Sequence, residues 1–177
     1  MRILKKALLA LLAIIALLAV VGFLLPSKYR VERSVVMRAK PEAVFNQLQT
    51  LKTWPEWTAW NVQRYPDMKT SFSGPEAGAG ATYNWDGQSV GVGSLKLTAA
   101  DPQKGIAYDL DFDSGQYLSK GEIKLEPSGE QLKVTWSNEG DLGWNPVNRY
   151  FGLMMDRMMG PDFETGLNNL KQKLESQ

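Results

Sequence analysis

The hydrophobic pattern of this chain begins with one long apolar run near the N-terminus. Residues 7–25 carry no charged side chain and no strong hydrogen-bonding side chain. As a helix rising ~1.5 Å per residue, this run is about 28 Å long, close to the thickness of the hydrocarbon core of a bilayer. The pattern predicts a transmembrane helix, and Pro26 and Ser27 mark its exit from the membrane.

A cleaved signal peptide is the alternative for the same residues. Its apolar region is typically ~7–15 residues long and ends at a site of small residues. Residues 20–22 make a poor cleavage site, and cleavage there would leave Phe23, Leu24 and Leu25 at the new N-terminus. We therefore favour an uncleaved anchor over residues 1–27, followed by one domain over residues 28–177.

Basic residues flank the apolar run on both sides. Arg2, Lys5 and Lys6 precede it, which favours an N-terminus in the cytoplasm by the positive-inside rule. Three further basic residues within residues 28–33 follow the run and weaken that bias. We expect a single-pass membrane protein whose domain lies on the periplasmic, or extracytoplasmic, side.

A second pattern, of short alternating segments separated by Gly, Pro and Asp, runs from Met68 to Trp136. The clearest segment is residues 106–112, in which every second residue is large and apolar. Such alternation predicts strands with one apolar face. We expect six hairpin-linked strands in a strongly bent antiparallel meander, and an additional, less regular strand over residues 28–38.

The sequence also predicts two local features of the meander, a hairpin turn and a β-bulge. The Asp-Gly pair at residues 86–87 predicts a hairpin turn. The large apolar residues change parity between Val92 and Leu95, beside Gly91 and Gly93. This change indicates a β-bulge, because a shift of one residue turns every following side chain to the other face of the sheet.

A short helix is predicted to begin at Pro41, since proline suits the first helical position and Glu42 suits the first turn. Its apolar stripe consists of Val44, Phe45, Leu48 and Leu51. Trp54, Trp57 and Trp60 follow at three-residue spacing. They either close one end of the sheet as a structural plug or contact a ligand. In both cases we expect burial, because so much ring area is costly to leave in water.

The last long pattern, residues 145–174, has apolar residues at helical spacing. Gly160 and Pro161 interrupt it, and a proline inside a helix removes an amide donor and clashes with the preceding turn. We therefore expect a kinked helix, or two helices of which the second begins at Pro161. Before the interruption the apolar surface is unusually broad and consists of Leu153, Met154, Met155, Met158 and Met159. These side chains either fill an irregular core or roof a cavity, because methionine adapts to many apolar shapes.

Together these elements predict an α+β fold, with an N-terminal transmembrane helix in addition. The concave face of a curved antiparallel sheet of about seven strands must be covered by something apolar. The C-terminal helix is the only long amphipathic candidate. A helix that crosses a curled sheet readily leaves space between the two, which makes an apolar pocket.

Composition excludes several classes of function. The chain has no cysteine and no histidine, so it has no disulfide, no thiolate nucleophile and none of the commonest general bases or metal ligands. The net charge is +1 and no basic face stands out, so we expect no nucleic-acid partner. The aspartates at residues 109, 111 and 113 resemble a calcium loop, but Ser114 and Lys120 occupy its glycine and acidic positions. We expect no metal site and no cofactor.

The domain also resembles a known family, the START-like or SRPBCC superfamily, in its polyketide cyclase/dehydrase and lipid-transport branch. The similarity covers roughly residues 29–174. It lies in residues 41–45 (PEAVF), Trp54, Trp57, Trp60, Gly80-Ala81 leading to Trp85, residues 91–93 (GVG), and residues 162–171 (DFETGLNNLK). The resemblance implies a helix-grip fold with a pocket between the C-terminal helix and the sheet. It implies no catalytic residues, because the family has none in common. A membrane-tethered form resembles a common bacterial arrangement, which implies the bacterial cytoplasmic membrane.

We therefore expect a membrane-anchored, non-enzymatic module that holds a hydrophobic small molecule such as a lipid, an isoprenoid or a quinone. The expected ligand-binding residues are Trp57, Trp60, Tyr83, Trp85, Tyr108, Leu110, Phe112, Trp136, Met154, Met155, Met158, Met159 and Phe163. One alternative is an enzyme of cyclase or hydratase type acting on an apolar substrate, with Tyr83 or Tyr108 as the group to test. Another is an envelope protein-interaction module with a vestigial cavity.

Overall fold

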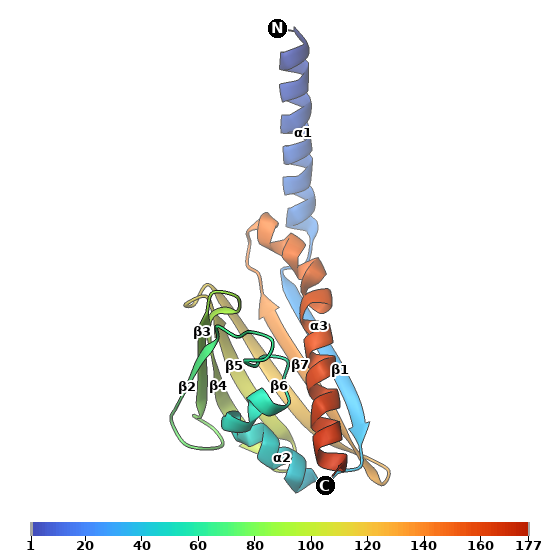
Figure 1. The fold of residues 1–177 in the computed structure, drawn as a ribbon. Coiled ribbons are helices and arrows are strands. Elements are labelled where there is room, and N and C mark those ends of the chain that lie inside the picture. The colour runs from blue at the N-terminus through green and yellow to red at the C-terminus, as the bar shows by residue number, and fades with distance from the viewer. Residues whose placement is uncertain (1, 177) are drawn as a thin grey trace.

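The computed structural model describes residues 2–176, and it has one sheet, one long helix packed on that sheet, and one helix that projects away from it (Figure 1). The elements in chain order are α1 (Arg2–Leu24), β1 (Lys28–Met37), α2 (Pro41–Gln49), the 3-10 helix η1 (Leu51–Glu56), β2 (Lys69–Ser73), β3 (Thr82–Gly87), β4 (Gly91–Asp101), β5 (Gly105–Phe112), β6 (Tyr117–Ser128), β7 (Gln131–Asp141) and α3 (Pro146–Glu175). The predicted α+β helix-grip class is confirmed.

The seven strands form one antiparallel sheet in the order β1-β7-β6-β5-β4-β3-β2. Strands β2 to β7 follow one another as hairpins, and β1 joins the sheet at its β7 edge. Lys28 at the start of β1 pairs with Asp141 at the end of β7. The end of β5, the start of β6 and the end of β7 therefore all lie toward α1.

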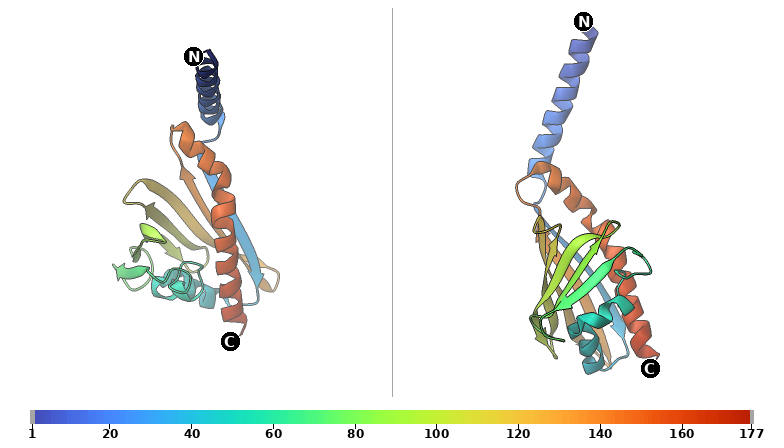
Figure 2. Two further views of the ribbon diagram at one scale, coloured as in Figure 1. Left: turned by 45° about the horizontal axis from the view of Figure 1, so that its top comes forward. Right: turned by 60° about the vertical axis from the view of Figure 1, so that its left-hand side comes forward.

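Alternation of side chains gives the sheet a buried face and a solvated face. Tyr108, Ile123 and Trp136 point to the buried face and are at most 4% exposed. The residues between them, such as Asp109 and Lys120, point to the other face and are exposed. We call the buried, concave side the inner face and the other side the outer face. The views from two further directions show α3 lying along the inner face near β1 (Figure 2).

An aromatic cluster fills the core under the second half of α3. The rings of Trp136 and Phe163 stack in parallel with their centroids 4.4 Å apart. Trp54 and Trp57 pack against Trp136 at 5.8 and 5.5 Å. Aromatic contacts of this geometry contribute about 0.5–1.5 kcal/mol each beyond the burial of their area. Trp54 and Trp57 are both buried in this cluster, as expected if they act as a structural plug.

The inner face has one charged side chain, and it explains how α3 sits on β1. Arg33 crosses α3 where Gly160 leaves room for it, since a Cβ on Gly160 would overlap the guanidinium group. The guanidinium donates to both carboxylate oxygens of Asp156, at 2.8 and 3.0 Å. This contact lowers the pKa of Asp156 and fixes the position of the two elements relative to each other.

Three local expectations need correction. The two-helix alternative for the C-terminus is wrong, because α3 is continuous through Pro161. The hairpin after β3 turns at residues 88–90, since the Asp-Gly pair at 86–87 is still paired with β4. The register shift in β4 lies between Leu97 and Ala99, whereas the pairing around Gly91 and Gly93 is regular.

Helix α1 is long and apolar enough to span a membrane, and it is the only such helix within residues 2–176. By length and composition alone, a signal sequence would pass the same test. Its final turns contact the start of α3, and Gly22 is its one buried residue. Apart from residue 1, which lies outside the described residues, the range of the predicted anchor is occupied by α1 and the three residues that follow it, and the anchor itself stays a prediction.

Candidate functional site

The structure divides the thirteen expected ligand-binding residues into three groups. Five belong to the buried core, where other side chains surround them: Trp57, Tyr83, Tyr108, Trp136 and Phe163. Five are partly buried and pack against that core: Trp60, Trp85, Leu110, Met155 and Met159. Three are exposed, namely Phe112, Met154 and Met158. Of the first two groups, five lie on the inner face of the strands, Met155, Met159 and Phe163 lie on the side of α3 that faces it, and Trp57 and Trp60 lie in the segment after η1.

The methionines of α3 point in two directions. Met155 and Met159 turn toward the core and pack on it. Met154 and Met158 are 52% and 58% exposed and make no part of the core. Only half of the expected methionine roof therefore faces the sheet.

The part of the inner face toward α1 is incompletely covered. Tyr29, Leu110 and Trp85 lie on this part of the face, yet water reaches each of them. Phe112, at the end of β5, is exposed on the same face. Under the second half of α3, in contrast, the aromatic cluster covers the inner face, so the inner-face residues there are buried. An apolar molecule bound between Trp85, Leu110 and Tyr29 would therefore cover most of the apolar surface that water still reaches on the inner face.

Two polar atoms of β3 on the inner face lack a partner. The Tyr83 hydroxyl and the Trp85 indole Nε1 are both buried without a hydrogen bond in the structure. They come from residues i and i+2 of one strand, so both side chains project to the same side. Burying an unpaired donor costs about 1–3 kcal/mol. A ligand with a hydroxyl or carbonyl oxygen at this point would satisfy either donor.

Glycines on neighbouring strands make room for these rings. A Cβ on Gly93 would overlap the indole ring of Trp85, and a Cβ on Gly121 would overlap the phenol ring of Tyr108. Both aromatic side chains therefore lie flat across the adjacent strand. In the sequence this arrangement is marked by a glycine on the neighbouring strand directly opposite each ring: Gly93 pairs with Trp85, and Gly121 pairs with Tyr108.

The Tyr108 hydroxyl, in contrast, is fully engaged. It accepts a hydrogen bond of 2.8 Å from Trp136 Nε1. Burial raises the pKa of Tyr108 from 10.0 to about 12, although hydrogen bonds with Trp136 and Asn138 oppose part of this shift. At neutral pH Tyr108 is a protonated, buried group, and its hydrogen bond orients the Trp136 ring against Phe163.

The raised pKa of Tyr108 predicts a loss of stability at alkaline pH. The unfolded phenol ionises near its ordinary pKa of 10.0, while the folded protein holds the proton up to about pH 12. The contribution is therefore fully present below pH 10 and declines as the pH rises toward 12, by roughly 1.4 kcal/mol per pH unit. Urea unfolding of Tyr108→Phe should show a smaller decline over this range. Tyr117→Phe, which removes the hydroxyl of an exposed tyrosine, should decline as the original chain does; equal slopes in all three proteins would contradict the assignment.

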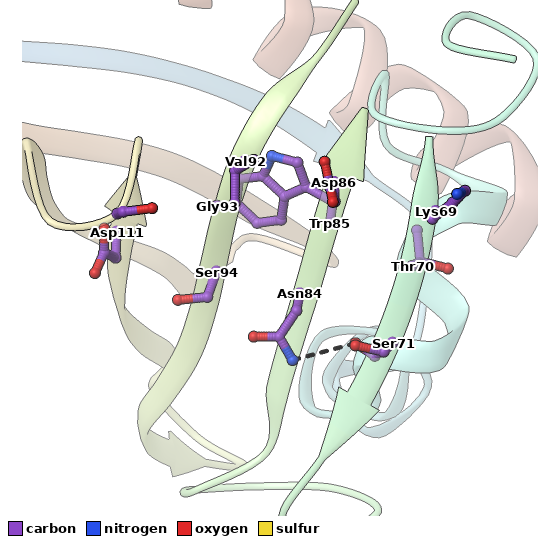
Figure 3. Close-up of a pocket in the computed structure, with 11 residues that line it drawn as sticks. Lys69, Thr70, Ser71, Asn84, Trp85, Asp86, Val92, Gly93, Ser94 and Asp111 are labelled. Atoms are coloured by element: carbon purple, nitrogen blue, oxygen red, sulfur yellow. Dashed lines mark hydrogen bonds between the residues drawn. The ribbon is translucent and has the colours of Figure 1, made fainter. Parts of the chain in front are cut away.

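Two hollows on the other side of the sheet were not expected from the sequence. The larger, of about 790 Å³, runs over the outer face of β1, β7, β6, β5 and β4 near their ends toward α1. The smaller, of about 370 Å³, lies beside it over β2, β3 and β4 (Figure 3). Ser94 and Asp111 line both, so the two adjoin. Tyr29 and Leu110 also belong to the lining of the larger hollow and Trp85 to that of the smaller, whereas no residue of α3 lines either.

The outer-face hollows are lined by charged side chains that compensate one another. Arg30 bonds Glu139 at 3.1 Å and Glu32 at 2.8 Å, and Lys120 and Asp109 face each other across β6 and β5. Exposed pairs of this kind contribute about 0–1 kcal/mol each. Within residues 2–176 no group of three or more acidic side chains converges as a metal site would require. We therefore assign the candidate site to the inner face.

Comparison with known proteins agrees with this architecture. Among the solved structures that share the fold, Ara h 8.0201 has a TM-score of 0.58 and 14% sequence identity, and the match covers 85% of this chain and 99% of that one. A protein from Chromobacterium violaceum has a TM-score of 0.54 and 18% identity, with the same coverage of 85% and 99%. StfQ, a di-domain ARO/CYC from the steffimycin biosynthetic pathway, has a TM-score of 0.63 and 12% identity, and the match covers 84% of this chain and 51% of StfQ. At these identities the similarity establishes the fold alone. Comparison with curated proteins gives no match.

A curved seven-stranded sheet gripping a C-terminal helix defines a START-like, or SRPBCC-type, domain. Residues 28–175 match the family described as polyketide cyclase/dehydrase and lipid transport. The chain belongs to that family, as the resemblance in its sequence predicted.

Proposed function

We propose that this protein is a membrane-anchored START-like domain that holds a hydrophobic small molecule, a lipid, isoprenoid or quinone-like compound, between α3 and the inner face. The observation that carries the proposal is the water-accessible apolar surface of Trp85, Leu110 and Tyr29 on the face whose other half, under the second half of α3, is buried. Burial of apolar area stabilises a complex by about 25 cal/mol per Å², so a lipid-sized ligand needs few polar contacts. The unpaired Tyr83 hydroxyl and Trp85 indole supply those few.

The packing of α1 supports a retained anchor. A cleaved signal peptide has no reason to fit the mature domain. Gly22 instead lies against α3 so closely that a Cβ would come within 2.7 Å of the Pro146 Cβ. Arg149 also donates to the carbonyl oxygens of Phe23 and Leu25, at 2.8 and 3.2 Å. We propose the bacterial cytoplasmic membrane as the location, with the domain on the extracytoplasmic side, on the basis of Arg2, Lys5 and Lys6, which precede the apolar run within α1.

Ligand recovery tests the binding proposal. The full chain, purified in a mild detergent, should release an apolar compound on solvent extraction and show the corresponding mass increment in native mass spectrometry. Leu110→Trp fills the accessible part of the inner face and should abolish the increment. Lys96→Trp places the same ring on the outer face of the adjacent strand and should leave the increment unchanged. Recovery of no apolar compound, or equal recovery from both variants, would contradict the proposal.

An enzyme acting on an apolar substrate is the second candidate, and the unpaired Tyr83 hydroxyl favours it. Burial raises the pKa of Tyr83, so the hydroxyl keeps its proton at neutral pH, and because it is unpaired it can donate a hydrogen bond to an oxygen of a bound substrate. StfQ, which shares the fold, is an ARO/CYC. If the recovered ligand changes in mass during incubation and Tyr83→Phe binds it without changing it, the enzyme replaces the carrier. If Tyr83→Phe and the original chain return the same unaltered compound, the carrier stands.

The third alternative, an envelope protein-interaction module with a vestigial cavity, requires the inner face to hold nothing. Failure of ligand recovery, together with co-purification of a protein that is lost from a variant of an exposed apolar residue, is the result that would favour it.

A further inference from the structure

The first half of α3 carries an apolar stripe that the rest of the described chain leaves uncovered. Val147, Phe151, Met154 and Met158 are separated by four, three and four residues, so at ~100° per residue they lie within about 60° of one another around the helix. Their side chains are 62%, 53%, 52% and 58% exposed, and Trp144 just before the helix is 77% exposed. We call these five residues the α3 stripe. Contiguous exposed apolar surface of this kind marks a contact with a partner or a membrane.

The joint between α1 and α3 fixes the depth of this stripe. The Tyr150 hydroxyl donates to the carbonyl oxygen of Leu18 at 2.7 Å. Leu18 lies seven residues before Leu25, the end of the apolar run, which is about 10 Å along a helix. The first turn of α3 therefore lies beside the last turns of α1, and the following turns run away from the end of α1 toward the sheet (Figures 1 and 2). Figure 1 shows the start of α3 next to the end of α1.

Other contacts make this joint close and specific. Gly22 is buried against Pro146 and Tyr150, and no residue with a larger side chain fits at its position. The ring of Trp144 stacks on that of Phe23 with the centroids 6.2 Å apart. Tyr150, Pro146 and Arg149 face α1, so the four helical residues of the α3 stripe point in other directions around the helix, while Trp144 contacts α1 itself. Wherever the last turns of α1 are surrounded by lipid, the beginning of the α3 stripe lies next to that lipid.

We propose that the first half of α3 lies in the interfacial layer of the bilayer that α1 spans, with the α3 stripe inserted among the acyl chains. This inference rests on the proposed function, since it needs α1 to be a retained span. Apolar faces of interfacial helices lie about 5–10 Å into the boundary between headgroups and acyl chains, in agreement with the depth of the Tyr150 contact. Tryptophan and tyrosine are enriched at that level, where Trp144 and Tyr150 lie.

The same helix then connects the bilayer with the inner face. Met155 and Met159 stand beside the α3 stripe on the helix and turn toward the core. An apolar molecule leaving the acyl chains would meet these methionines next, without crossing open water. The occupant of the α3 stripe is therefore the lipid of the same leaflet.

The absence of cysteine from the chain makes a direct test possible. Single-cysteine variants Phe151→Cys and Met154→Cys of the full chain are labelled with the environment-sensitive dye NBD and reconstituted in liposomes of phosphatidylcholine and phosphatidylglycerol. Leu153→Cys is the matched control, because Leu153 is equally exposed but lies ~100° from Met154 around the helix. Glu130→Cys, in the turn after β6, is the control for a site far from α1. Urea unfolding verifies that each variant is folded.

The inference predicts blue-shifted NBD emission at residues 151 and 154, with quenching by doxyl-labelled lipids, weaker quenching at Leu153 and none at Glu130. Emission typical of water at 151 and 154, in protein that resists extraction by alkaline carbonate, would overturn the inference and leave the anchor intact. A blue shift without lipid quenching would overturn it too, because a second copy or another protein would then cover the α3 stripe. Release of the protein by carbonate would overturn both the anchor and the inference.

Discussion

Replacing Gly105 with alanine is expected to destabilise the domain by roughly 2–6 kcal/mol, a large part of the ~5–15 kcal/mol of a typical domain. Gly105 begins β5 with φ at +106°, a conformation that a residue with a side chain adopts only at a cost of about 1–3 kcal/mol. An added Cβ would also overlap the carbonyl oxygen of Ile123 on β6. Because that atom belongs to the backbone of a central strand, relief requires the two strands to move apart, which costs a further 1–3 kcal/mol or so.

Gly115→Ala is the matched control for this variant. Gly115 has φ at +91°, yet nothing lies within 4 Å of the Cβ that alanine would add. It should therefore show the conformational cost alone. The measurement is urea unfolding of the full chain in a non-ionic detergent, followed by tryptophan fluorescence. If both variants lose the same free energy of unfolding, the close approach of Gly105 to β6 is refuted.

Trp136→Ala is the second variant with a large expected effect. Trp136 is 1% exposed, stacks on Phe163 and donates to the Tyr108 hydroxyl, so its removal leaves both a cavity and an unpaired polar group. Truncation of a buried tryptophan typically costs about 3–5 kcal/mol. Because Phe163 lies in α3, the loss should also loosen the second half of that helix.

Two variants separate the causes of this effect. Trp136→Phe keeps a stacked ring but removes the indole donor, and should cost about 1–3 kcal/mol. Trp144→Ala removes an indole that is 77% exposed and should change the free energy of unfolding by less than about 0.5 kcal/mol in detergent. Hydrogen exchange at Leu167 and Leu170 would follow α3 directly. Unchanged protection there in Trp136→Ala would show that the aromatic cluster does not hold the helix.

The strands were predictable because their alternation is strict and their inner-face residues are large. The register shift is predicted at the wrong position because Val92 is apolar but 45% exposed, so the apolar pattern indicates a change from one face of the sheet to the other where none occurs. The true shift lies beside Ala99 and Ala100, whose small side chains give no contrast between the two faces. Alternation thus detects a bulge only where large side chains flank it.

The candidate site was less accessible to sequence reasoning. Helical spacing groups Met154 with Met158 and Met155 with Met159, but the same spacing serves a core, a cavity or a membrane. Which of these surrounds each pair depends on how α3 is placed relative to α1 and the sheet. Contacts such as that of Tyr150 with Leu18 set this placement. The unpaired state of the Tyr83 hydroxyl likewise depends on neighbours from other strands. The outer-face hollows follow from the twist of the sheet, which no residue pattern records.

The junction between anchor and domain has a consequence for transport. Only residues 25–27 separate α1 from β1, and the Ser27 carbonyl oxygen is itself bonded to the Leu142 amide at 2.8 Å. Under the proposed function, this short connection holds the domain close to the membrane, so a bound ligand would be released at the depth at which it was taken up. Transfer to a second membrane would then need a separate, diffusing acceptor, whereas exchange within the same leaflet would need only lateral diffusion.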